Sequence, residues 1–143
     1  MNLNDSLNQM SKDLLDFFFP RHCPFCGRVS EKALLCEQCA RTLPRCAEVR
    51  TGPFGECAAP LYYEDAVRDA LLAFKFRGKV ENLNCFGALM AETAASAFAD
   101  RFDAVTWTPV SQKRLKKRGF DQARYLTASM CVDWHVAPIE TLW

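Results

Sequence analysis

The chain has 143 residues, half of them hydrophobic, and a formal net charge of only +1. This length allows one modest core and a small additional module, and the near-neutral charge excludes nucleic-acid binding over the whole surface, so any such affinity needs a local basic patch. The eight cysteines occur without a secretory signal or a membrane-spanning run, which predicts a reduced, cytoplasmic setting and no membrane contact.

The first 19 residues form a segment with its own pattern. Hydrophobic residues recur there at helical spacing, at Leu3, Leu7, Met10, Leu14 and Phe17. We therefore expect an amphipathic helix over residues 4–19, as an N-terminal element (1–19) that ends at Pro20.

Two Cys-x-x-Cys pairs follow, and they are the clearest chemical motif of the chain. Their members are Cys23 and Cys26, then Cys36 and Cys39. Four thiolates at this spacing suit a tetrahedral Zn²⁺ ion, and because no coordination position stays open, the site is predicted to be structural and not catalytic. Disulfides or a redox pair are the competing interpretations, which the duplicated motif and the reducing setting disfavour.

The other four cysteines are less informative. Cys46 and Cys57 lie at the end of the zinc-ribbon module that we expect over residues 20–57, and they supply only half of a second zinc site. Whether they bind metal stays open. Cys85 and Cys131 lie in helical patterns, and an isolated thiol in such a position is usually a small core residue.

Residues 58–143 alternate between strand and helix patterns, which predicts an α/β domain. We expect strands over 58–63 and 104–109. The first helix is expected to be capped by Asp65 and to carry Val67, Ala70, Leu71 and Phe74 on one face. Further helices are expected over residues 81–99 and 120–132.

A basic segment connects the second expected strand to the last helix. It contains Lys113, Arg114, Lys116, Lys117 and Arg118, with no acidic residue among them, and Gly119 follows. A loop that enters a helix N-terminus offers free N–H groups and the helix dipole to an anion, so phosphate is the expected ligand. The alternative is a solvated basic turn without a ligand.

A second group of cations ends the first expected helix. Lys75, Arg77 and Lys79 lie at the C-terminal end of this helix, where positive charge offsets the helix dipole. This interaction alone is a sufficient reason for cations at these positions, without a ligand. The aromatic side chains of Phe76 and Phe120 lie near these cations in the sequence and could stack on nucleic-acid bases.

Three segments together resemble the ComF family of phosphoribosyltransferase-like proteins. They are Leu61–Arg68, Phe74–Lys79 and Arg118–Ala123, in that order. The resemblance implies an N-terminal zinc module followed by an incomplete type I phosphoribosyltransferase-like α/β domain over residues 58–143. It also implies that one phosphate or pyrophosphate site gathers the following residues: Lys75, Arg77, Lys117, Arg118, Gly119, Phe120, Asp121 and Gln122.

The chain departs from that family pattern in one respect. It has no Asp-Asp-x-x-Thr-Thr-Gly segment to hold phosphoribosyl pyrophosphate (PRPP), so PRPP is an expected substrate only if the natural chain continues beyond Trp143. The resemblance leaves an enzyme, complete or degenerate, as one hypothesis. The other is a zinc-dependent module without catalysis that binds single-stranded DNA, a nucleotide or a protein of the competence machinery during DNA uptake. A vestigial fragment is the third.

Overall fold

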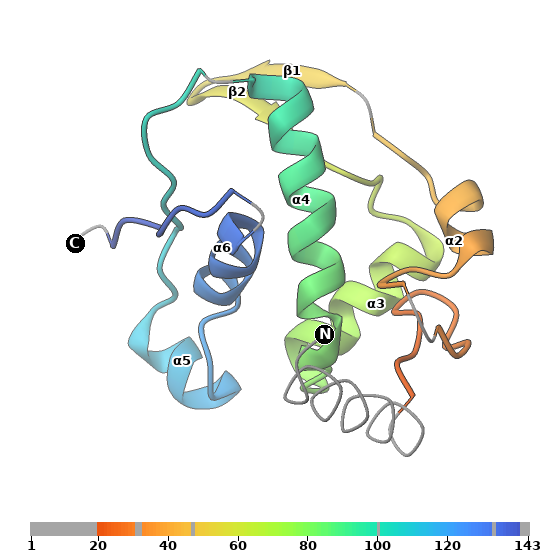
Figure 1. The fold of residues 1–143 in the computed structure, drawn as a ribbon. Helices are drawn as coiled ribbons and strands as arrows, with labels where there is room; N and C mark the ends of the chain where they lie inside the picture. The colour runs from red at the N-terminus through yellow and green to blue at the C-terminus, as the bar shows by residue number, and fades with distance from the viewer. Residues whose placement is uncertain (1–19, 31–32, 47, 100, 133, 141–143) are drawn as a thin grey trace, which may run out of the picture. The chain divides into compact units, whose positions relative to one another are not determined.

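A computed structural model describes residues 20–30, 33–46, 48–99, 101–132 and 134–140 (Figure 1). The helix expected over residues 4–19 lies outside this part of the chain. The chain divides into two compact units, Met1–Thr42 and Leu43–Trp143. The first contains the paired cysteines, and the second contains all the other helices and strands described below.

The first unit is built from a turn and one short helix. An antiparallel bridge joins His22 to Val29, and it closes the turn that carries the first cysteine pair. Helix α2, Glu37–Thr42, begins directly after Cys36 and contains Cys39, the two members of the second pair. An exposed ion pair between Arg41 and Glu37, 3.0 Å long, lies along this helix.

The second unit begins with a hairpin. Strands β1 (Val49–Gly52) and β2 (Gly55–Ala58) pair antiparallel, with Arg50 opposite Cys57. The strand expected over 58–63 is therefore wrong in its bounds, and beyond Ala58 only an isolated bridge joins Leu61 to Arg45. Pro60 explains the interruption, because a proline has no N–H to donate to a ladder.

Two helices follow. Helix α3, Asp65–Phe76, buries Val67, Ala70 and Phe74 as predicted, although Glu64 and not Asp65 occupies the N-cap position. It stops before Gly78, whose φ of +67° is the left-handed conformation that ends helices without a Cβ penalty.

Helix α4 forms the long central element of the second unit (Figure 1). A short 3₁₀ turn, η1 (Val80–Asn82), leads into α4, Leu83–Phe98, which matches the helix expected over 81–99 to within two residues. After α4, Arg101 donates to the carbonyl oxygens of Phe98 (3.0 Å) and Ala97 (2.8 Å). These bonds satisfy acceptors that the helix end leaves without partners.

Helix α6, Gln122–Val132, packs against α4. The two helices approach closely at Gly87, where a Cβ atom would lie only 2.3 Å from Ser129 Oγ. Cys85 and Cys131 are buried, which confirms the prediction that both are core residues. Phe74 is fully buried and meets Phe86 edge to face, with ring centroids 5.6 Å apart.

The basic segment is a helix and not the loop that we expected. Helix α5 runs over Gln112–Arg118, after Ser111 as N-cap, and ends at Gly119 with a φ of +81°. Lysine, arginine, leucine and glutamine all favour helix, and cations in the last turn interact favourably with the dipole. These preferences outweigh the repulsion between like charges four residues apart, such as Arg114 and Arg118.

The strand expected over 104–109 is not formed within the described residues. Residues 102–110 have no regular secondary structure, although their burial alternates, with Val105 and Trp107 half-buried between exposed neighbours. A strand exists only when another strand pairs with it, and the described neighbour supplies a single bond, from Ile139 N to Val105 O (2.8 Å).

The described chain is thus a mixture of helices with one small two-stranded sheet and a cysteine cluster. The parallel sheet of the expected α/β domain is absent from it. Among these same residues, no helix is both long and apolar enough to cross a bilayer.

Candidate metal centre and basic helix

The four paired cysteines converge on one point. Their Sγ atoms, from Cys23, Cys26, Cys36 and Cys39, all lie within 4.8 Å of one another, and the Sγ atoms of Cys26 and Cys36 are 3.5 Å apart. In a tetrahedral site with Zn–S bonds of about 2.3 Å, the sulfur atoms lie about 3.8 Å apart. The observed spacing therefore leaves room for one zinc ion at the centre.

Local backbone geometry places each pair. The N–H of Gly27 donates to Cys23 O (2.9 Å), and the φ of +72° at Gly27 lets the chain turn tightly after the second ligand. In the other pair, the N–H of Cys39 points at Cys36 Sγ at 3.4 Å, within the first turn of α2. The N–H of Cys39 is thus aimed at sulfur, where it stabilises thiolate charge.

The thiols differ in acidity. Burial raises the pKa of Cys23, but hydrogen bonds from the backbone N–H groups of Cys36, Phe25 and Cys26 outweigh it and bring that pKa to about 7. Burial and hydrogen bonds with the neighbouring thiols instead raise the pKa of Cys39. A metal ion must therefore displace a proton from Cys39, so metal binding releases acid.

The donor set fits zinc in a structural role. Four cysteine sulfurs fill a tetrahedral coordination sphere, and soft thiolates suit Zn²⁺ better than Mg²⁺ or Ca²⁺. Beside the cluster, the Ser30 hydroxyl is buried and donates to Ala33 O (2.7 Å), which holds the loop between the two pairs. The four cysteines form a zinc-binding site, as the spacing predicted.

Cys46 and Cys57 belong to no second such cluster in the part of the chain that the structure describes. Among the described residues, the only group of three or more candidate ligands is the one above. The Cys46 thiol instead lies within hydrogen-bond reach of the Tyr62 hydroxyl, and this contact raises the pKa of Tyr62. Cys57 is exposed on strand β2.

One cation of α5 contacts the end of α3 in the second unit. The Arg118 guanidinium lies over the ring of Phe76, 5.2 Å from its centroid. This contact brings the end of α5 beside the end of α3, where Lys75 and Arg77 are both exposed. The remaining cations of α5, including Lys117, are exposed as well.

The two aromatic candidates behave differently. Phe120 packs edge to face on Phe74, with centroids 5.8 Å apart, and on Tyr125 at 6.0 Å. It is therefore part of the core rather than a free stacking surface. Phe76 is 64% exposed and carries Arg118 against one face, so it can still receive a base.

Asp121 and Gln122 have structural partners at the start of α6. The Asp121 carboxylate accepts hydrogen bonds from the N–H groups of Arg124 (3.1 Å) and Val110 (3.4 Å), the first of which is a helix cap. Gln122 is only 4% exposed and accepts from Arg118 Nη1 (3.0 Å), while its Nε2 has no partner among the described residues. A buried donor in that state is costly unless a water or ligand satisfies it.

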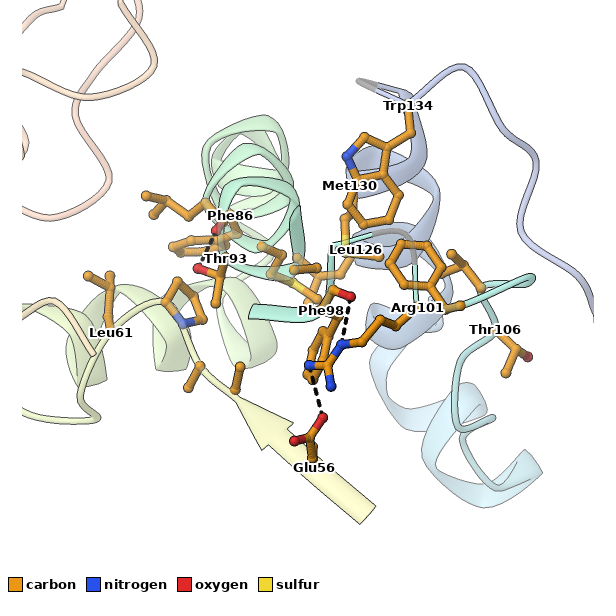
Figure 2. Close-up of a pocket in the computed structure, with 18 of the residues that line it drawn as sticks. Glu56, Leu61, Phe86, Thr93, Phe98, Arg101, Thr106, Leu126, Met130 and Trp134 are labelled. Carbon is orange, nitrogen blue, oxygen red and sulfur yellow. Dashed lines mark hydrogen bonds and ion pairs between the residues drawn. The ribbon is translucent and has the colours of Figure 1, made fainter. Parts of the chain in front are cut away.

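The sequence analysis missed an apolar cavity in the second unit (Figure 2). It is a pocket of about 1240 Å³, open to solvent on one side, that is lined by α3, α4, α6, the hairpin and residues 101–106. At its rim, Arg101 forms an ion pair with Glu56 (3.0 Å). Arg101 and Glu56 lie in no hydrophobic repeat of the sequence. Only the apolar faces of α4 and α6 could have indicated this cavity.

Comparison with known proteins defines the class of the chain first. Residues 14–70 match the double zinc ribbon domain family, and these residues contain the four-cysteine cluster. The chain therefore carries a zinc ribbon. Only one complete cluster is found in the described part of that match, with Cys46 and Cys57 left outside it.

A curated relative then supplies the family. The chain is 30% identical over 112 residues to the competence protein ComFC of Bacillus subtilis (strain 168), covering 78% of this chain and 45% of ComFC. The chain belongs to the ComF family, with an N-terminal zinc ribbon. It spans a little less than half the length of this relative, and no solved structure matches it significantly.

Proposed function

We propose that this chain is the zinc-stabilised, phosphate-binding part of a ComF-type protein that handles single-stranded DNA or nucleotides, as in DNA uptake. The observation that carries the proposal is the arrangement around Arg118. Its guanidinium lies between an exposed aromatic ring, Phe76, and a buried amide, Gln122, that has a donor left over. An arginine held in this way is positioned to meet a phosphate group beside a stacked base.

The charge of α5 supports the same proposal. Like charges at i and i+4, such as Lys113 and Lys117, repel one another, and the described α5 contains no acidic residue to offset them. A bound polyanion would relieve this repulsion. Because the net charge of the chain is only +1, the cations of α5 are a local excess of positive charge, and positive and negative charges nearly cancel over the rest of the chain.

The experiment is a titration of a fluorescent oligo-dT with the 143-residue protein at several salt concentrations. Substituting Lys116, Lys117 and Arg118 by Ala should weaken binding and flatten the slope of log K against log salt by about 2, since each phosphate contact on a single strand contributes roughly 0.7. A control triple substitution of Arg41, Arg50 and Arg68 by Ala removes the same charge elsewhere and should change the slope little. Equal slopes for the two triple variants would contradict the proposal.

The alternative is a phosphoribosyltransferase-like site that holds pyrophosphate. The ComF resemblance favours it, whereas the missing Asp-Asp-x-x-Thr-Thr-Gly segment disfavours it in this chain. Competition separates the two functions. Displacement of oligo-dT by micromolar PRPP or pyrophosphate, but not by equal inorganic phosphate, would indicate the enzyme-like site.

A further inference from the structure

Two arginines, one on either side of Gly119, lie against aromatic rings. The Arg118 guanidinium is 5.2 Å from the centroid of the Phe76 ring. The Arg124 guanidinium is 5.7 Å from the centroid of the Trp107 ring. Arg118 is the last residue of α5, and Arg124 lies in the first turn of α6. A guanidinium that already rests on a ring loses less side-chain freedom when it binds a phosphate group, so both arginines are preorganised for an anion.

The Asp121 carboxylate fixes the backbone around the second of these pairs. It accepts hydrogen bonds from the N–H groups of Val110 (3.4 Å) and Arg124 (3.1 Å). Residues 107–110 therefore lie beside the start of α6, and this places the Trp107 ring under the Arg124 guanidinium.

Arg124 differs from another arginine that lies over a ring. Arg101 is 6.0 Å from the centroid of the Phe98 ring, but its guanidinium also forms an ion pair with Glu56 and donates to carbonyl oxygens at the end of α4. The donors of Arg101 are thus used within the fold. The Arg124 guanidinium has no hydrogen-bond or ion-pair partner among the described residues, and its side chain is exposed. Its donors are available to a ligand.

An exposed aromatic ring accompanies each of the two arginines. Phe76 is 64% exposed, and Tyr125, which follows Arg124 directly, is 52% exposed. The Tyr125 ring packs edge to face on Phe120, which in turn packs on the buried Phe74. Tyr125 is therefore anchored from the core side while about half of it stays open. A nucleic-acid base can stack on a ring that is held in this way.

We propose that two positions, Arg118 with Phe76 and Arg124 with Tyr125, bind successive parts of one single strand, so that the ligand is an oligonucleotide and not a free nucleotide. This inference rests on the proposed function, whose site is the first position, and it decides between the two ligands named there. A strand carries one negative charge per nucleotide along its length. It can therefore reach both rings and the exposed cations of α5 at once, which a single nucleotide cannot.

The test measures affinity against the length of the strand. The 143-residue protein is titrated at fixed salt with fluorescein-labelled oligo-dT, as a dinucleotide and as a dodecamer. Occupation of the second position becomes intramolecular once the first is bound, so we expect the dodecamer to bind at least about 10-fold more tightly. A duplex of the same length should bind more weakly than the dodecamer, because its bases are already stacked on one another.

Variants locate the second position. Tyr125→Ala should weaken binding of the dodecamer by about 5- to 150-fold, the value of one stacked base, and that of the dinucleotide by no more than about twofold. Tyr125→Phe keeps the ring and should bind as the unchanged protein does. Tyr63→Ala is the matched control, because Tyr63 is 58% exposed and precedes α3, at the opposite end of that helix from Phe76. Arg124→Gln should flatten the slope of log K against log salt by about 0.7, one phosphate contact.

Three results would overturn the inference. They are dodecamer binding that Tyr125→Ala leaves unchanged, equal affinity for the dodecamer and the dinucleotide, and equal affinity for the dodecamer and the duplex. Each can occur while the Ala substitution of Lys116, Lys117 and Arg118 still flattens the salt slope, and the proposed function would then stand with one position only. Equal slopes for the two triple variants contradict the proposed function itself.

A second measurement covers the case in which Tyr125→Ala fails to fold, as judged by zinc content and far-ultraviolet circular dichroism. The unchanged protein is irradiated with a dodecamer that carries 5-iodouracil, and the cross-linked residues are mapped by mass spectrometry. A cross-link at Tyr125 supports the second position. Cross-links at Phe76 without one at Tyr125 overturn it.

Discussion

The zinc site and the basic region show how differently two motifs of one chain depend on the rest of the protein. The zinc ligands span only Cys23 to Cys39, and two local turns bring them together. In the basic region, which is the end of α3 together with α5 and the start of α6, Arg118 contacts Phe76 and Phe120 contacts Phe74, so segments far apart in the sequence meet through helix packing. When the residues of a site lie close together in the sequence, their spacing predicts the geometry of the site. When they are far apart in the sequence, only the chemistry of the site can be predicted.

The two regions also depend on different forces. In the described part of the first unit, residues 20–30 and 33–42, the only buried hydrophobic residues are Cys23 and Cys39, so metal coordination has to stabilise this part of the fold. In the second unit, Phe74, Phe86 and the contact of α4 with α6 form an apolar core. Substitutions in one unit should thus leave the stability of the other unit unchanged.

The largest effect is expected at the zinc site. Cys36→Ser should lose the metal and unfold residues 20–43, because binding of structural zinc can contribute about 10–16 kcal/mol of apparent free energy. Metal analysis and heteronuclear NMR would measure both losses. Cys57→Ser, at an exposed cysteine outside the cluster, is the control and should keep one equivalent of zinc. One equivalent of zinc in Cys36→Ser would refute the ligand set.

The next effect concerns the core of the second unit. Phe74 is fully buried, so Phe74→Ala should lower the free energy of unfolding by about 3–5 kcal/mol without loss of zinc. Phe76→Ala, two residues later on the exposed side of α3, should change stability by less than about 0.5 kcal/mol. Urea unfolding with zinc quantification checks both values. Zinc release in Phe74→Ala at low urea would show that the two units are coupled.

A smaller effect is expected where α4 and α6 cross. Gly87→Ala would place a methyl group 2.9 Å from the backbone carbon of Ser129, a clash that no rotamer can relieve, so we expect destabilisation by about 1–3 kcal/mol. Helix propensity alone predicts the opposite sign, a gain of about 1 kcal/mol. The sign of the change in melting temperature therefore decides between close packing and propensity. Gly52→Ala, with its nearest atom 3.7 Å away, is the uncrowded control.

How much the sequence could predict follows from the same contrast. The cysteine spacing predicted the zinc cluster, and the hydrophobic period predicted α3, α4 and the buried face at Phe74. The sequence pattern did not predict α5. A run of cations is typical of a solvated loop, and here the helix propensity of its residues outweighs the repulsion between their charges. Nor could it decide the strand expected over 104–109, whose existence depends on a partner strand and not on its own residues.

The smallest effect separates capping from ligand binding at Asp121. Its carboxylate accepts from Arg124 N at 3.1 Å, so Asp121→Ala should lower the free energy of unfolding by about 1 kcal/mol, whereas Asp121→Asn should keep most of the cap. Neither change removes a cation, and Asp121→Asn removes a negative charge beside Arg118. If Asp121 is a cap, Asp121→Asn should bind oligo-dT at least as well as the unchanged protein, as measured by the same titration. Weaker binding by a stably folded Asp121→Asn variant would instead make the carboxylate part of the ligand site, and the basic region would then resemble the zinc site in using its motif residues directly.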